Sequence, residues 1–311
     1  MLPEIIRKLL IVVGLGGIFV AGSEFWFYPV DEGLSSLITL LAYGVLAYGL
    51  VIILSRLKVK DFWGFFLLAN LFGFMVEGAI VPYLYSGIPL TIVWTSMAWH
   101  ALLTVSVGWY LVYVWAAKSV WLQSLFYASV GLFLGGWNTL LWGATEVEGT
   151  QQLVWSWMNP LYFSEQFLFG TLLFIGGHIL FRLAQPSSIV FTKIDLLVTA
   201  LAVGAWGGLT IVSALPLSLI IVPLVLVCMY PVWKSRFSAP ELSTVLEKLD
   251  ECPVGIKTYL LMLIIPLFAI PSYWLLYTYQ IELEWNALLI VTAGPISLYL
   301  FSKSFVKVLR G

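Results

Sequence analysis

Long apolar stretches alternate with short polar segments along the whole chain. Each stretch is long enough to cross a bilayer, which takes about 20 residues of helix. The pattern predicts an all-α, polytopic membrane protein with about ten transmembrane helices. The expected spans are residues 9–28, 34–55, 62–84, 90–116, 119–143, 160–182, 194–213, 215–233, 257–278 and 285–303.

Two of these boundaries depend on local signals. The break between the seventh and eighth spans needs a tight turn, and Pro216 favours one because proline ends a helix. At the N-terminus, Arg7 and Lys8 followed by an apolar stretch and small residues at 21–23 also fit a cleaved secretory signal. We favour a retained first helix, because the apolar stretch continues through residues 25–28.

The basic residues fall on one side of this topology. All fifteen lysines and arginines lie in the two termini or in the connections from an even to an odd helix. The opposite connections carry acidic residues only, which are Asp31, Glu32, Glu146, Glu148, Glu282 and Glu284. The positive-inside rule therefore places both termini in the cytoplasm of an integral protein of the plasma or inner membrane.

The composition agrees with a membrane protein and excludes some partners. Hydrophobic residues make up 61% of the chain and charged residues 10%, too few charges to cover the exterior of a soluble domain. The net charge of −1 gives no reason to expect nucleic acid as a partner. Cys228 and Cys252 fall in an apolar helix and in a cytoplasmic segment, so they predict neither a disulfide nor a metal site.

Polar residues are distributed unequally along the chain. The first six spans hold nearly all the polar residues inside the membrane, so we divide the chain into residues 1–190, which carry the site, and residues 191–311, an apolar four-helix part. The longest hydrophilic stretch, residues 234–257, has apolar residues at helical spacing. It predicts an amphipathic helix over 238–251 that lies on the cytoplasmic membrane surface.

Ionisable groups inside a bilayer are costly and mark candidate sites. Glu77, His100 and Glu165 are expected in the outer half of the membrane and are the candidate catalytic residues. Glu24 and Asn138 lie at similar depth and are candidate substrate-binding residues.

Ser96, His100 and Thr104 recur every four residues and predict one polar stripe on a helix. His178 is expected nearer the cytoplasm, hydrogen-bonded between helices.

Most tryptophans fit the aromatic belt at the membrane surface. Some can instead line a pocket and stabilise a cationic intermediate. The candidates for this role are Trp94, Trp99, Trp142 and Trp155. No haem, phosphate-loop or metal-binding spacing occurs, so we expect no cofactor and no metal, although a metal site assembled from Glu77, His100 and Glu165 stays open.

Two stretches resemble membrane enzymes that act on isoprenoids. WSWMNPLYFSEQFLF, residues 155–169, resembles the loop and acidic helix of the small membrane lycopene cyclases. MVEGAIVPYLY, residues 75–85, is similar to the Glu-Gly helix of the emopamil-binding sterol isomerases. The glutamate and the following Pro-Leu of the longer stretch 70–103 are similar to carotenoid hydratases of the bisanhydrobacterioruberin type. The double glutamate of the cyclases is here Glu165-Gln166, and the histidine of the isomerases is Gly73. The resemblance implies that Glu77 and Glu165 are acids.

These observations lead to one main hypothesis and two alternatives. A carboxylic acid kept protonated in an apolar pocket can protonate a carbon–carbon double bond, and His100 can remove a proton elsewhere. We therefore expect an isomerase, cyclase or hydratase of a hydrophobic isoprenoid such as a carotenoid or sterol, in contact with membrane lipids. The alternatives are a proton-coupled small-molecule transporter and a non-catalytic membrane subunit or lipid-binding scaffold. The sequence names no protein partner.

Overall fold

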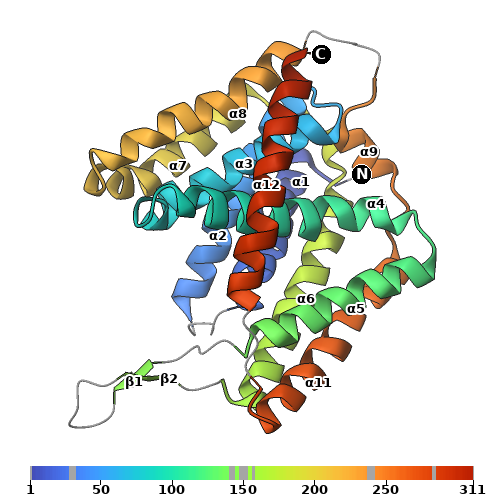
Figure 1. Cartoon of the computed structure of the whole chain (residues 1–311). Coiled ribbons are helices and arrows are strands. Elements are labelled where there is room, and N and C mark those ends of the chain that lie inside the picture. The colour runs from blue at the N-terminus through green and yellow to red at the C-terminus, as the bar shows by residue number, and fades with distance from the viewer. Residues whose placement is uncertain are drawn as a thin grey trace.

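The protein is an all-α polytopic membrane protein. Its computed structural model describes residues 2–27, 33–139, 144–146, 153–155, 158–236, 242–281 and 285–310, and residues 144–146, 153–155 and 285–286 by their backbone alone. Within this part of the chain, ten helices are long and apolar enough to cross a membrane (Figure 1). The expected number of spans is therefore confirmed.

Several spans combine an α-helix with a π- or 3-10-helical segment. The first six spans are α1 (Glu4–Val20) with η1 (Ala21–Phe25), α2 (Leu34–Arg56), α3 (Phe62–Met75) with η2 (Val76–Ile80), η4 (Ile92–Leu111) with α4 (Val112–Ala116), α5 (Val120–Trp137) and α6 (Pro160–Ala184). The last four are α7 (Lys193–Ser213), η6 (Leu217–Ile220) with α8 (Ile221–Ser235), α10 (Ile256–Met262) with α11 (Ile264–Thr278), and α12 (Trp285–Arg310). The connections contain η3 (Pro82–Tyr85), η5 (Pro186–Ser188), α9 (Val245–Glu251) and an antiparallel pair of short strands, β1 (Ala144–Glu146) and β2 (Leu153–Trp155).

The observed helix ends follow local signals. The predicted break between the seventh and eighth spans is confirmed, because α7 ends at Ser213 and η6 follows Pro216. The third span is shorter than predicted: it ends at Ile80, and Pro82 begins the separate turn η3. The last span extends beyond the predicted residue 303 to Arg310.

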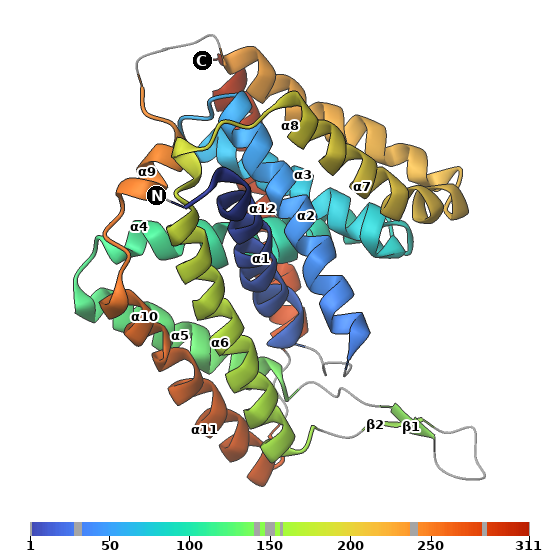
Figure 2. The ribbon, with the colours of Figure 1, turned by 180° about the vertical axis from the view of Figure 1, so that it is seen from behind.

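The helices pack around α1, α3 and η4. α1 lies against α2 and α6, α3 lies against η4, and α5 pairs with α11 (Figures 1 and 2). Lipid gives helices little hydrophobic reason to associate, so close contact relies on small residues. A Cβ on Gly44 would lie 2.4 Å from the carbonyl oxygen of Val12, and one on Gly16 would lie 2.7 Å from that of Leu40. These glycines let α1 and α2 touch along their backbones.

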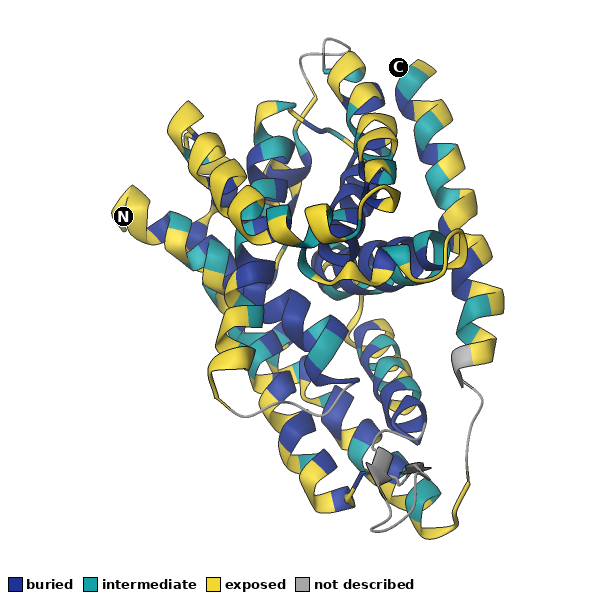
Figure 3. Cartoon of the chain, turned by 90° about the vertical axis from the view of Figure 1, so that its left-hand side faces the viewer, coloured by how far each residue is buried: buried dark blue, intermediate teal, exposed yellow. Residues whose placement is uncertain are grey.

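The last four helices surround the first six without forming a body of their own. α7 packs on α2 and η2, and α8 packs on α3, while α11 packs on α5 and α6. α12 crosses η4, α3 and α8. Figure 3 shows buried residues gathered inside the bundle and exposed residues on its outer helices. The division at residue 190 stays a division by composition.

The predicted amphipathic helix over 238–251 differs from the observed one. Residues 237–241 lie outside the described part of the chain, and α9 begins after the cap Thr244, whose side chain and that of Glu247 form a capping box. The apolar face of α9 is buried against protein: Val245 is 1% exposed, and its N–H donates to the carbonyl oxygen of Val59 at 2.7 Å. The helix therefore closes one end of the bundle instead of exposing its apolar face to lipid.

Candidate functional site

Three π-helical segments each carry one of the predicted ionisable residues. Glu24 lies in η1, Glu77 in η2 and His100 in η4. π-Helical segments are rare and often mark functional sites. The turns of η4 are wide, and accordingly the Thr104 hydroxyl donates to the carbonyl oxygen five residues earlier, that of Trp99, at 3.0 Å. The predicted stripe of Ser96, His100 and Thr104 lies on η4, and all three side chains are buried.

Glu77 and His100 form a buried pair, as the sequence predicts. The distance between His100 Nε2 and Glu77 Oε1 is 2.8 Å, and the two residues are 2% and 7% exposed. The other two polar atoms of the pair, Glu77 Oε2 and His100 Nδ1, are buried without a hydrogen-bond partner among the described residues. Such atoms are costly in an apolar interior and call for an explanation, of which a catalytic role is one.

The pair depends on a close contact between the two helices that carry it. A Cβ on Gly73 would lie 2.2 Å from the carbonyl oxygen of Ser96 and 3.3 Å from the Cβ of His100. Only glycine lets α3 approach η4 so closely, one turn before Glu77. Gly73, which stands where the isomerase pattern has histidine, therefore has a steric role here.

A second pair lies beside the first. The hydroxyl of Tyr43 on α2 donates to Glu24 Oε1. The Tyr43 ring lies 6.0 Å from the His100 ring, centroid to centroid, and Glu24 interacts electrostatically with His100 and Glu77. Four titratable side chains from four spans thus form one cluster, which we call the Glu24–Tyr43–Glu77–His100 cluster.

Three polar side chains hold the segment that carries Glu24. Asn138 Nδ2 donates to the carbonyl oxygen of Trp26 at 2.8 Å, and Gln166 Nε2 donates to that of Phe25 at 2.9 Å. Trp99 Nε1 donates to the carbonyl oxygen of Ser23 at 3.2 Å. Asn138 and Trp99, expected to contact substrate, therefore position η1.

The structure does not bring Glu165 to the cluster. Glu165 lies on the exposed face of α6, whereas its neighbour Gln166 is 8% exposed and faces the bundle. Successive residues point in very different directions on a helix, and the buried face of α6 is set by Phe163, Gln166 and Phe167. The expectation that Glu165 shares a chamber with Glu77 and His100 is wrong. His178 bonds between helices as predicted, with Nε2 3.1 Å from the carbonyl oxygen of Gly108.

The candidate tryptophans form part of an aromatic group next to the cluster. The Trp94 ring packs against Trp99 at 5.8 Å, and Trp99 packs against Phe27 at 4.3 Å and Trp137 at 5.0 Å between ring centroids. Trp142 and the side chain of Trp155 lie outside the described residues.

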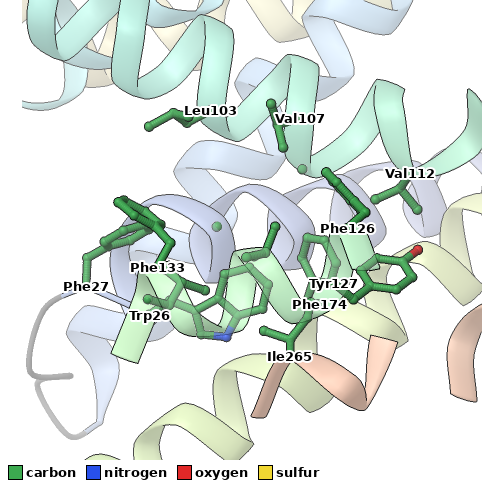
Figure 4. A pocket seen from close by; sticks show the side chains of 14 residues that line it. Trp26, Phe27, Leu103, Val107, Val112, Phe126, Tyr127, Phe133, Phe174 and Ile265 are labelled. Atoms are coloured by element: carbon green, nitrogen blue, oxygen red, sulfur yellow. The ribbon is translucent and has the colours of Figure 1, made fainter. Parts of the chain in front are cut away.

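Apolar cavities lie near the cluster. One of about 90 Å³ has an aromatic wall (Figure 4), which includes Trp26, Phe27, Phe126, Tyr127, Phe133 and Phe174. Two others lie between α2 and α7, with volumes of about 240 and 360 Å³; η2 also lines the smaller one, and α3 and α8 also line the larger one. Neither Glu77 nor His100 lines these three cavities. Within the described part of the chain, no three His, Cys, Asp or Glu side chains are placed to hold a metal ion.

Comparisons with known proteins gave no match. No protein-family model, curated protein or solved structure matches this chain. The resemblance to isoprenoid-modifying enzymes therefore stays a prediction.

Sequence reasoning missed Tyr43 and Gln166. Tyr43 lies in the middle of an apolar stretch, where a tyrosine cannot be told apart from the other large apolar residues by the hydrophobic pattern. A signal was present, because a buried phenol usually finds a hydrogen-bond partner. Gln166 is the second residue of the Glu165-Gln166 motif, and helical spacing alone did not show which of the two faces inward.

Proposed function

We propose that this protein is a membrane-embedded acid–base enzyme that protonates a carbon–carbon double bond of an isoprenoid lipid. The observation that carries the proposal is the buried Glu77–His100 pair, whose two outer atoms have no partner among the described residues. General acid–base catalysis needs a donor and an acceptor placed together in a site that excludes water. The pair supplies both.

The proton positions follow from the hydrogen bond. When His100 Nε2–H donates to Glu77 Oε1 and the pair is neutral, the glutamic acid proton sits on Oε2 and Nδ1 holds a lone pair. Oε2–H then gives its proton to one carbon of the double bond, which leaves a carbocation. Nδ1 removes a proton from a neighbouring carbon, and the double bond forms again at a new position.

After the reaction both groups become neutral again, with their protons on the opposite atoms. Transfer of the Nε2 proton to Oε1 neutralises both groups and leaves Nδ1–H as the donor and Oε2 as the acceptor. The isomerisation consumes no co-reactant, because one proton enters the lipid and one leaves it. A cyclase would use the same protonation and deprotonation, with ring closure of the carbocation between them.

Glu24 and Tyr43 have a supporting role in this proposal. Their pair lies beside His100, with the Tyr43 ring 6.0 Å from the His100 ring between centroids, so Glu24 is the second carboxyl next to the reacting groups. The Glu24 carboxyl thereby takes the place expected for Glu165 as the second acid of the site.

The test follows deuterium from water into lipid and applies to any isoprenoid substrate. Protein is placed in vesicles of total membrane lipid in heavy water, and mass spectrometry measures the deuterium content of each isoprenoid. We expect deuterium in a lipid with the wild type and with Glu165→Gln, the matched control on an exposed carboxyl. Glu77→Gln and His100→Gln should abolish the exchange while the protein stays folded.

Two results would contradict the proposal. One is exchange by Glu77→Gln at the wild-type rate, and the other is no exchange above empty vesicles with the wild type. Solute uptake driven by a proton gradient, without deuterium in lipid, would instead favour the transporter hypothesis, since carboxylate and histidine clusters also serve proton coupling.

We also propose that both termini face the cytoplasm, on the basis of the charge distribution along the sequence. The Glu24–Tyr43–Glu77–His100 cluster then belongs to the outer half of the membrane. Cysteine labelling at residue 2 and at residue 33 from either side of sealed vesicles tests this orientation.

A further inference from the structure

The two cavities between α2 and α7 lie end to end. Leu46 and Val203 line both of them. Along α2 the lining residues run from Leu41 to Ile53, a length of about 18 Å at 1.5 Å per residue. The cavities together therefore have the dimensions of a single extended hydrocarbon chain.

The cavity walls offer hydrocarbon and one hydroxyl. Thr199 is the one residue with a hydroxyl among those that line the two cavities, and that hydroxyl donates to the carbonyl oxygen of Asp195 at 2.8 Å. α7 itself has few buried residues, namely Thr199 and Gly207. Its loose packing leaves space beside α2 that a chain from the surrounding lipid can fill.

One end of this space approaches the acid–base cluster. Ala79, two residues after Glu77, and Ala42, next to Tyr43, line the smaller cavity. Phe72 lines the larger cavity and also packs its ring on Tyr43, with centroids 6.1 Å apart. The Phe72 side chain thus lies between the larger cavity and Tyr43.

The other end carries two exposed cations next to the ion pair of Lys8 and Asp195, in which Nζ lies 2.9 Å from Oδ2. Arg56 lies one helical turn beyond Ile53 on the same face of α2, and Lys193 lies one turn before Leu196 on the same face of α7. Both cations are exposed. Arg56 also donates to the carbonyl oxygen of Phe191 at 3.0 Å, which holds its guanidinium beside the start of α7.

We infer that the two α2–α7 cavities hold the hydrocarbon chain of an isoprenyl phosphate, with its phosphate beside Arg56 and Lys193. Arginine and lysine are the residues that bind phosphate best. A chain placed this way points its far end toward Glu77. The inference rests on the proposed function, because it names the class of lipid on which the Glu77–His100 pair would act.

The test measures binding, which does not require turnover. Radiolabelled geranylgeranyl phosphate and geranylgeraniol, which differ in the phosphate alone, are bound to protein in nanodiscs. Val203→Trp fills the junction of the two cavities, and Leu201→Trp is its control on a residue that is 63% exposed. The double variant Arg56→Gln/Lys193→Gln removes the charge, and Lys118→Gln is its control on an exposed cation elsewhere.

We expect the charge variant to bind geranylgeranyl phosphate about tenfold more weakly than wild type and to bind geranylgeraniol unchanged. Val203→Trp should lose both ligands, while Leu201→Trp and Lys118→Gln should bind as wild type. Equal binding of the phosphate and the alcohol by wild type would overturn the inference, as would unchanged binding by Val203→Trp. Equal competition by phosphatidic acid would also overturn it, because the occupant would then be a phospholipid.

The binding assay and the deuterium-exchange assay test the two proposals independently. Binding by the Glu77→Gln variant without any deuterium exchange in wild type would support the cavity assignment and refute the proposed chemistry. Exchange without phosphate-dependent binding would do the reverse.

Discussion

Replacement of Gly73 by alanine tests whether the backbone contact between α3 and η4 creates the reactive pair. The new Cβ would lie 2.2 Å from the carbonyl oxygen of Ser96. A relaxed contact between carbon and oxygen is about 3.3 Å. The two helices must therefore separate by about 1 Å near this point.

The separation acts directly on the pair one turn away. The distance between His100 Nε2 and Glu77 Oε1 is 2.8 Å, and an increase of about 1 Å takes it beyond hydrogen-bond range. We expect deuterium exchange into lipid to fall about 100-fold, the usual effect of a misplacement of this size. The overpacked contact should also lower the free energy of unfolding by about 1–3 kcal/mol.

Gly131 provides a matched control. A Cβ there would lie 2.3 Å from the carbonyl oxygen of Ile265, at the contact of α5 with α11. Gly131→Ala should therefore destabilise the protein to a similar degree and leave the Glu77–His100 pair intact. Deuterium exchange and thermal unfolding, followed by tryptophan fluorescence, are measured on both variants. If Gly73→Ala and Gly131→Ala reduce the exchange equally, the specific role of the α3–η4 contact is refuted.

Three further predictions address other parts of the molecule. Glu165→Gln should leave the free energy of unfolding within about ±0.5 kcal/mol of wild type in thermal melts, because the side chain is exposed; a larger loss would show a contact that the structure lacks. Tyr43→Phe should destabilise the fold by about 1–3 kcal/mol and slow the exchange, because it removes the donor to Glu24; an unchanged exchange rate would show that the Tyr43–Glu24 hydrogen bond has no part in the reaction. Burial raises the pKa of Asp250 in α9 above its usual value, against the lowering effect of hydrogen bonds from Ser187. Protonated Asp250 therefore stabilises the fold fully at pH values below the pKa that this residue has in the unfolded chain. This stabilisation is lost as the pH rises through the pKa that it has in the folded protein. Thermal melts from about pH 4 to about pH 7 should show the wild type losing stability relative to Asp250→Asn, and parallel curves would contradict this assignment.

The sequence by itself determined the number and order of the spans. Twenty-residue apolar stretches have no other stable arrangement in lipid, because each backbone polar group must bond within its own helix. It also identified Glu77 and His100, since an ionisable residue deep in an apolar stretch stands out whatever its neighbours in space are.

Only the tertiary structure decided which of these groups meet. Helical spacing predicts which residues share a face, but it does not say how the helix is rotated about its axis. It therefore could not show that Gln166 faces inward and Glu165 outward. The π-helical turns at η1, η2 and η4 also came from the tertiary structure, because an apolar stretch has the same composition in an α-helix and in a π-helix. Tyr43 joined the cluster because α2 packs where its hydroxyl reaches Glu24, a long-range contact that no local pattern encodes.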